Sequence, residues 1–387
     1  MNIPDPQAYT PMMQQYLEIK KDYTDFIVFF RLGDFYEMFF TDALVASKEL
    51  EIVLTGRDAG APERVPMCGV PHHAAQVYAQ KLIDRGYKIA IVEQVEDPQL
   101  AKGLVRREVI KIMTPGTLME EGSVDARTNN YIVALEETKS SWILAYCDLT
   151  TGEVSLLSIP HQEELLESEI ANLNAKEVVL SSHAPKHLFR NYLELNELTL
   201  STQDETSIPV SYRSLVSDIY DKDLLTAFGR LVGYLEKTQK RELMHLQKAI
   251  VFESRSYLQI DHHSIRNLEL IETYRSQSKK GTLLWLMDDC QTAMGSRYLK
   301  QTILRPLTDV TKIALRHAFV ASMNDHFLIH EELKTHLKEV YDLERIIGRL
   351  SFGNANAKDL VHLAKSLSVV PEIRSMMRSL EDPYASS

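Results

Sequence analysis

The spacing of apolar residues changes along the chain, and this change decides which folds it can adopt. The stretches DFIVFFRLG (residues 25–33) and KIAIVEQVE (residues 88–96) are apolar runs with the length and composition of buried strands. Between them, residues 74–87 carry apolar side chains at helical spacing and reach Gly86, a residue that suits a helix C-terminus. The order strand, helix, strand predicts a mixed α/β domain over residues 1–113.

A second α/β domain is expected over residues 127–245, after a linker at residues 114–126 that contains Pro, Gly and acidic residues. The runs NYIVALEE, SWILAYCDL and TTGEVSLLSI follow one another, the last two joined by a Thr-Gly turn, and predict a meander of strands. The run AKEVVLSS predicts a further strand, and DLLTAFGRLVGYLEKTQ predicts a closing amphipathic helix.

Helical spacing prevails from about residue 246, so residues 246–387 are expected to be mostly α-helical. Apolar residues at three- and four-residue steps predict a helix that stops at Arg305-Pro306; they are Leu283, Leu286, Met287, Cys290, Met294, Tyr298 and Leu299. Asn356 is a predicted N-cap, with Asp359 three residues later, for a helix that should end before Pro371.

Composition limits the classes of function. The 43 Lys and Arg residues against 54 Asp and Glu residues give a net charge of −11, which argues against a general nucleic-acid binder and requires any contact with a polyanion to be local. No apolar run approaches the roughly 20 residues of a membrane span, and the N-terminal residues lack the pattern of a signal peptide, so a cytoplasmic protein is expected. The three cysteines have no CxxC spacing, and the pairs His72-His73 and His262-His263 are interpreted as surface histidines.

The stretch RLGDFYEMFF (residues 31–40) combines aromatic rings with carboxylates next to a glycine. If it is a strand that continues past Gly33, Phe35 and Glu37 point to one face, and Tyr36 and Met38 to the other. A helix expected from about Thr41 would place Phe35 and Glu37 at an exposed strand-to-helix corner. On the residues alone, a buried Phe35 and a solvated Glu37 remain the simpler interpretation.

Seven stretches together resemble the MutS family of DNA mismatch repair proteins, in the family's order and across nearly the whole chain. They are GDFYEMF, RVPMCGVPHHA, VEDPQLAKG, IMTPGTL, RNLELIET, TAMGSRYLKQTILRPL and DLERIIGRLSFGNANAKDL. GDFYEMF is similar to the family's mismatch-reading Phe-X-Glu motif. The resemblance implies that Phe35 stacks on a mispaired base from the minor groove and that Glu37 forms a hydrogen bond to that base.

The same resemblance implies four lesser DNA contacts. Arg57 matches an arginine near the DNA backbone, although the family usually has Lys-Arg-Gly where this chain has Gly56-Arg57-Asp58. Pro66 and Met67 match residues that line the minor groove, and Arg107 matches a further basic contact. For Arg57 and Arg107, a solvated surface charge is the alternative.

For the rest of the chain, the resemblance implies an RNase H-like connector domain, which would dock MutL, and then the start of the helical core and lever domain. It implies a longer, dimeric ATPase that binds ATP and Mg²⁺ in a C-terminal domain. It also implies a bacterial cytoplasmic protein that associates with the nucleoid. Because no GxxxxGK[ST] motif occurs, this chain itself is expected to bind no cofactor or metal and not to hydrolyse ATP.

Two other classes of function stay open. A metal-dependent nuclease would use Asp148, placed like a first-strand catalytic acid, with Glu153 nearby, but no third carboxylate is evident, and Asp148 is expected instead to brace the Thr-Gly turn. A protein-docking module would bind MutL or the replication sliding clamp through residues 127–245 without autonomous DNA binding.

Overall fold

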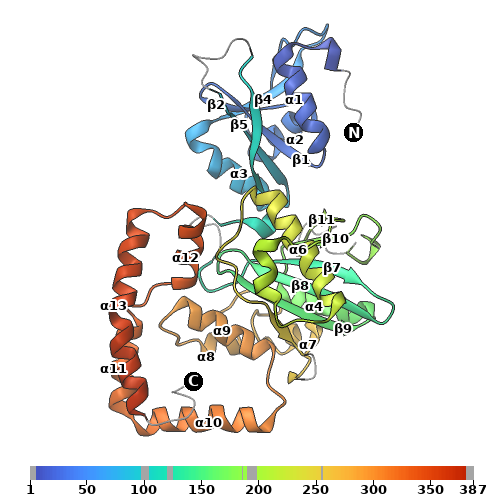
Figure 1. The fold of residues 1–387 in the computed structure, drawn as a ribbon. Helices are drawn as coiled ribbons and strands as arrows, with labels where there is room; N and C mark the ends of the chain where they lie inside the picture. The colour runs from blue at the N-terminus through green and yellow to red at the C-terminus, as the bar shows by residue number, and fades with distance from the viewer. Residues whose placement is uncertain are drawn as a thin grey trace. The chain divides into compact units, whose positions relative to one another are not determined.

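The computed structural model describes residues 6–96, 104–119, 125–184, 186–189, 198–253 and 256–380 (Figure 1). The chain divides into two compact units. The first comprises Met1–Leu118, Phe189–Ser201 and Tyr234–Glu242. The second comprises Met119–Leu188, Thr202–Gly233 and Leu243–Ser387.

The first sheet has the strand order β3-β4-β2-β1-β5-β6. Its strands are β1 (Phe26–Leu32), β2 (Phe35–Phe39), β3 (Thr55–Arg57), β4 (Val65–Pro71), β5 (Lys88–Gln94) and β6 (Arg107–Met113). Strands β1 and β5 are parallel, and helix α3 (Ala75–Ile83) directly precedes β5, whereas the other neighbours are antiparallel. The predicted strand, helix, strand order is therefore present, with Gly86 in a left-handed conformation after the helix (φ +83°).

The strand at residues 26–32 does not continue past Gly33, contrary to our expectation. Gly33 and Asp34 form a two-residue turn, with Gly33 at φ +58°, and Leu32 pairs with Phe35 across the resulting hairpin. A glycine takes this left-handed conformation without the steric cost that a Cβ would bring. Phe35 therefore lies at the hairpin turn, at the opposite end of β2 from helix α2 (Phe40–Leu50), and not at a strand-to-helix corner.

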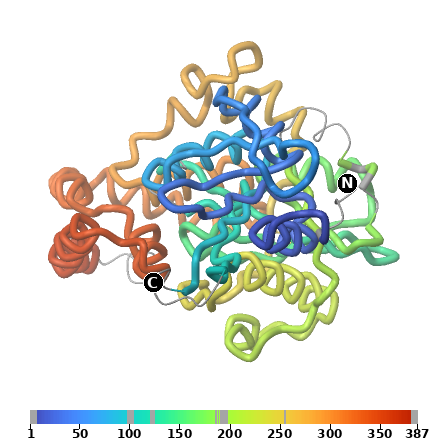
Figure 2. The backbone as a smooth tube through the Cα atoms, turned by 90° about the horizontal axis from the view of Figure 1, so that it is seen from above, coloured from blue at the N-terminus to red at the C-terminus, as the bar shows by residue number. Residues whose placement is uncertain are grey.

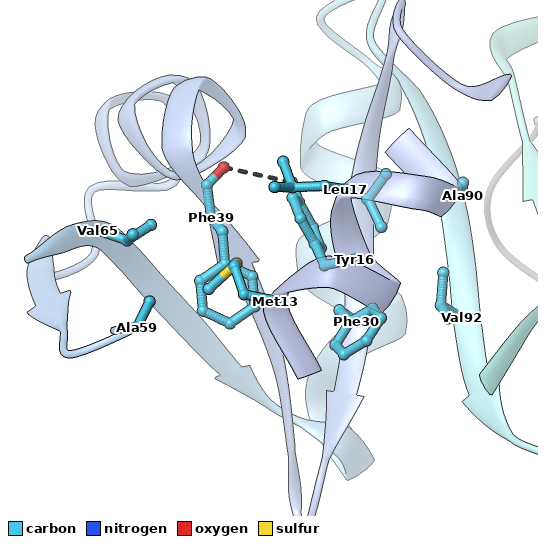
Figure 3. Packing of buried hydrophobic residues seen from close by; sticks show 10 residues of the cluster. Met13, Tyr16, Leu17, Phe30, Phe39, Ala59, Val65, Ala90 and Val92 are labelled. Carbon is cyan, nitrogen blue, oxygen red and sulfur yellow. Dashed lines mark hydrogen bonds between the residues drawn. The ribbon is translucent and has the colours of Figure 1, made fainter. Parts of the chain in front are cut away.

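The core of this sheet lies under helix α1 (Pro11–Asp22). Met13, Tyr16 and Leu17 of α1 pack against a cluster of strand residues, namely Val28, Phe30, Phe39, Val65, Ala90 and Val92 (Figure 3). The hydroxyl of Tyr16 donates a hydrogen bond to the carbonyl oxygen of Phe39 at 3.3 Å, which ties the helix to the end of β2. On the other face, Cys68 of β4 contacts α2, which packs beside α3.

The second sheet has the order β11-β10-β7-β8-β9-β12. Its strands are β7 (Tyr131–Glu137), β8 (Ser141–Asp148), β9 (Glu153–Pro160), β10 (Glu177–Leu180), β11 (Thr199–Thr202) and β12 (Ile250–Phe252). The predicted meander is confirmed, because β7, β8 and β9 pair antiparallel in sequence order. Helix α4 (Glu163–Leu173) follows β9 and packs against it, and helix α6 (Lys222–Gln239) follows β11 in the chain. Residues 114–119, at the start of the expected linker, are buried.

From His262 onward the described chain is mostly helical, and the helices from α10 to α13 are drawn in orange to red in Figure 1 and Figure 2. The helices are α7 (His262–Asn267), α8 (Leu283–Met287), α9 (Ala293–Leu304), α10 (Val310–Asp325), α11 (Phe327–Leu337), α12 (Leu343–Phe352) and α13 (Ala357–Ser379). Helices α11 and α13 pack against each other, and α10 and α11 contain no buried residue.

Two helix predictions are wrong in part. The helix expected before Arg305 is broken between α8 and α9, because the carboxylate of Asp288 turns inward to Lys279, Ser296 and Arg127. Asn356 does cap α13 in a capping box with Asp359, but the helix runs through Pro371 to Ser379. Pro371 is exposed, and so is Leu367, whose carbonyl the missing N–H of Pro371 leaves without an intrahelical partner.

Candidate nucleic-acid interface

Phe35 and Glu37 share one face of β2, as the alternation of a strand predicts. Phe35 is 48% exposed, although it is a large apolar side chain at the edge of an aromatic core. Tyr36 and Met38, on the other face, are buried. The interpretation of Phe35 as a core residue is therefore wrong, and its ring projects beside the β1–β2 turn.

Glu37 is held by an arginine from another strand. Nη1 of Arg57, in β3, donates a hydrogen bond to Oε2 of Glu37 in an ion pair whose side chains are 36% and 17% exposed. Gly69 of β4 lies directly opposite Glu37, and a Cβ there would be 3.5 Å from Cγ of Glu37. The cross-strand position beside Glu37 therefore carries no side chain.

The structure separates Pro66 from Met67. Met67 pairs with Phe39 and Thr55 and packs against the cluster under α1, so it lies on the same face of the sheet as Phe35 and Glu37. Pro66 pairs with Gly56 and points to the other face, because neighbouring residues of a strand alternate. Of the two, only Met67 therefore belongs to the face that carries Glu37.

Arg107 is buried and is not a solvated surface charge. Its guanidinium lies over the ring of Phe30 and donates hydrogen bonds to the carbonyl oxygens of Arg31 at 2.8 Å and Val105 at 2.9 Å, and to Gln15 at 3.2 Å. Burial, and secondarily the charge of Arg57, lower the pKa of Arg107. In this arrangement Arg107 braces strands β1 and β6 beneath the exposed part of the face.

The opposite side of the hairpin is fixed by a polar cluster that sequence reasoning did not find. The hydroxyl of Tyr36 donates a hydrogen bond to Glu93, and Arg31 lies over the Tyr36 ring and 3.6 Å from Glu93. Burial, and then the bond to Glu93, raise the pKa of Tyr36 above its usual range, so the phenol stays neutral and keeps its donated bond. Phe35 and Glu37 therefore stand on a hairpin whose other face is well anchored.

Asp148, the candidate nuclease residue, braces its turn as expected. It is fully buried, and its carboxylate accepts hydrogen bonds from the side chain of Asn129 at 3.1 Å, the backbone N–H of Asn130 at 3.2 Å, and the N–H and hydroxyl of Thr150 at 2.9 and 2.6 Å. Helix α12 approaches this turn closely at Gly348. A Cβ at Gly348 would lie only 2.6 Å from the carbonyl oxygen of Thr150.

Glu153, at the end of the same turn, is also engaged by the protein. It accepts hydrogen bonds from Tyr131 at 3.2 Å and from Gln301 of α9 at 3.1 Å. Burial raises the pKa of Glu153, and the charge of Asp148 adds to this effect. In the described part of the chain, no group of three or more His, Cys, Asp or Glu residues could hold one metal ion.

Comparison with known proteins identifies the family. The chain matches MutS domain I over residues 10–122, MutS domain II over residues 130–247 and MutS domain III over residues 263–387. The chain belongs to the MutS family. Within it, the exposed Phe35 and the paired Glu37 lie in MutS domain I, and the turn of Asp148 lies in MutS domain II.

Individual relatives agree with this assignment. The DNA mismatch repair protein MutS of Bacillus mycoides (strain KBAB4) is 47% identical over 378 residues, which are 97% of this chain and 42% of that protein. The DNA mismatch repair protein MutS of Geobacillus sp. (strain WCH70) is 47% identical over 379 residues, 98% of this chain and 44% of that protein. The chain therefore spans less than half the length of these MutS relatives.

Proposed function

We propose that this chain reads mismatched base pairs in double-stranded DNA, with Phe35 as the wedge and Glu37 as the partner of the mispaired base. The observation that carries the proposal is the exposure of Phe35, 48%, on the same face as the ion-paired Glu37, two residues away on a rigid strand. Exposed apolar wedges that enter a base step unstack it and kink the duplex.

The energetics favour a mismatch over a paired site. Unstacking costs a few kcal/mol per step and costs least where pairing is already lost. Stacking a base on the Phe35 ring returns about 1–3 kcal/mol and depends little on the identity of the base, which suits a protein that accepts many mismatches. The easier kinking of a mispaired step adds to the preference.

Glu37 supplies the discrimination. A carboxylate near DNA repels phosphates, yet it accepts a hydrogen bond from a base N–H that has lost its partner. A perfect duplex offers no such free donor, so Glu37 weakens binding there. Among the lesser contacts, Met67 is supported by its place on this face, and Arg57 lies on the same face in an ion pair with Glu37. Pro66 faces away, and Arg107 would have to break bonds to two carbonyls to reach a phosphate.

We propose the following organisation for the rest of the chain: a mismatch-binding domain at residues 1–113, a linker at 114–126, an RNase H-like connector at 127–245 and part of a core and lever domain at 246–387. The antiparallel meander β7-β8-β9 with β10 parallel to β7 supports the connector. A MutS protein of family length would be a dimer, bind ATP and Mg²⁺ outside this chain, and signal to MutL, with the sliding clamp as a further partner.

Fluorescence anisotropy tests the proposal on a G·T-mismatched duplex and its G·C counterpart at low salt. Wild type should bind the mismatched duplex more tightly than the paired one. Phe35→Ala should lower the ratio of these two affinities by about tenfold, because the stacking energy is lost. Leu44→Ala is the matched control, since Leu44 is also 48% exposed but lies on α2. An unchanged preference in Phe35→Ala would overturn the wedge and favour a docking module. Divalent-ion-dependent cleavage lost in Asp148→Ala would favour a nuclease.

A further inference from the structure

The charge of Arg57 is paired with a carboxylate of the same chain. Its guanidinium is paired with Oε2 of Glu37, and the charge of Arg57 also acts on the buried Arg107. An arginine that serves mainly as a phosphate contact would extend from the surface without a carboxylate partner. Arg64, four residues before Cys68, has that character, because it is exposed and forms no ion pair among the residues that the structure describes.

The pairing leaves half of the Glu37 carboxylate available. Oε2 is bonded to Arg57, and no described residue donates a hydrogen bond to Oε1. A carboxylate has acceptor sites on both oxygens, so one oxygen can hold Arg57 while the other accepts from a base. The residue opposite Glu37 is Gly69, so no cross-strand side chain competes with a base for this carboxylate oxygen.

We propose that Arg57 is the positioning residue of Glu37, holding one carboxylate oxygen so that the other accepts a hydrogen bond from a mispaired base. This inference rests on the proposed function. Arg57 offsets the charge of Glu37 and fixes its direction, which reduces the freedom that the side chain would otherwise lose on binding. Arg57 would then set selectivity between duplexes without contacting DNA itself.

The test measures the affinity of the whole chain for G·T and G·C duplexes at several salt concentrations. Arg57→Gln should lower the ratio of the two affinities by about tenfold, because a charge-assisted hydrogen bond is no longer oriented. In the Glu37→Gln background, Arg57→Gln should change the ratio no further. Arg57→Lys should restore part of the ratio, since it keeps the charge, and Arg64→Gln should leave the ratio unchanged.

A phosphate contact gives a different result. In that case Arg57→Gln would weaken both duplexes equally and reduce the slope of log affinity against log salt by about 1, also in the Glu37→Gln background. Either this result or an unaltered ratio in a folded Arg57→Gln variant overturns the proposal. The partial rescue by Arg57→Lys separates a positioning role from misfolding.

Wild type and Phe35→Ala, measured in the same series, show which idea has failed. If wild type has no mismatch preference, or Phe35→Ala retains it, the proposed function fails and the role of Arg57 falls with it. If wild type and Phe35→Ala behave as proposed while the Arg57 variants do not, only the inference about Arg57 is overturned.

Discussion

Single buried charges in this chain are stabilised by several partners, and Asp288 is a clear case. Its side chain is 2% exposed and accepts hydrogen bonds from Lys279 at 2.5 Å, Ser296 at 2.8 Å and Arg127 at 3.3 Å. Burial by itself raises the pKa of Asp288, but these donors outweigh it and lower the pKa to about 2. The folded state therefore favours the ionised form relative to the unfolded chain.

This shift predicts the pH dependence of stability at Asp288. Its folded pKa lies below the ordinary value, so its contribution is present above about pH 4 and is lost as the pH falls toward 2. Asp288→Asn should cost up to about 2 kcal/mol of unfolding free energy at pH 7, since water screens the half-exposed partners.

Urea unfolding at pH 7 and near pH 2.5 measures the effect, and the gap between wild type and Asp288→Asn should shrink at the lower pH. Asp289→Asn is the control, because the Asp289 side chain is 84% exposed. This substitution should change the free energy of unfolding by less than about 0.5 kcal/mol. A gap that stays constant with pH would contradict the ionic origin of the effect.

The candidate site was partly predictable at the scale of residues. Alternation along a strand is enough to place Phe35 and Glu37 on one face, and this holds although the strand begins only after the Gly33 turn. The pair between Glu37 and Arg57 could not be predicted, because it depends on how β3 and β4 align with β2. The residues around Glu37 do not by themselves specify that register.

At the scale of elements, α6 contains two glycines with opposite consequences. A Cβ at Gly229 would lie 1.8 Å from the backbone carbonyl oxygen of Thr206, so the chain at Thr206 crosses the helix at this point. A Cβ at Gly233 would lie 3.1 Å from the side-chain amide of Gln203, which can move aside. Glycine is therefore required at the first position and is replaceable at the second.

The matched pair Gly229→Ala and Gly233→Ala tests this packing. Alanine is the better helix former by about 1 kcal/mol, so Gly233→Ala should keep or raise stability. Gly229→Ala should lower it by about 2 kcal/mol or more, because overpacking against backbone outweighs helix propensity. Thermal unfolding of the two variants measures the difference, and equal stabilities would contradict the close approach.

Elements defined by local pattern were predictable, and those defined by distant contacts were not. The strands β1, β5, β7, β8 and β9 follow from apolar runs. The break between α8 and α9 is held in part by Arg127, far away in sequence, and α13 continues through Pro371, which is exposed. The short strand β12, in a region expected to be helical, forms only because the edge of β9 is there to pair with it.

For the molecule as a whole, charge governs how DNA is approached. A net charge of −11 leaves attraction to DNA to a few local cations, so binding by this chain should be weak and sensitive to salt. Raising the salt from about 50 to 200 mM should weaken binding to a G·T duplex by about tenfold, as two or so phosphate contacts would give. Tight, salt-independent binding in the same anisotropy titration would contradict this expectation.

The most direct test of the central claim places 2-aminopurine, whose fluorescence reports base stacking, at the mispaired position of a duplex. Binding of wild type should change the 2-aminopurine signal at the mismatch and leave a fully paired duplex unaffected, because Phe35 enters only where unstacking costs little. Phe35→Ala at saturating concentration should give no such change, whereas Leu44→Ala should behave as wild type. The same signal change with wild type and Phe35→Ala would show that Phe35 is not the wedge.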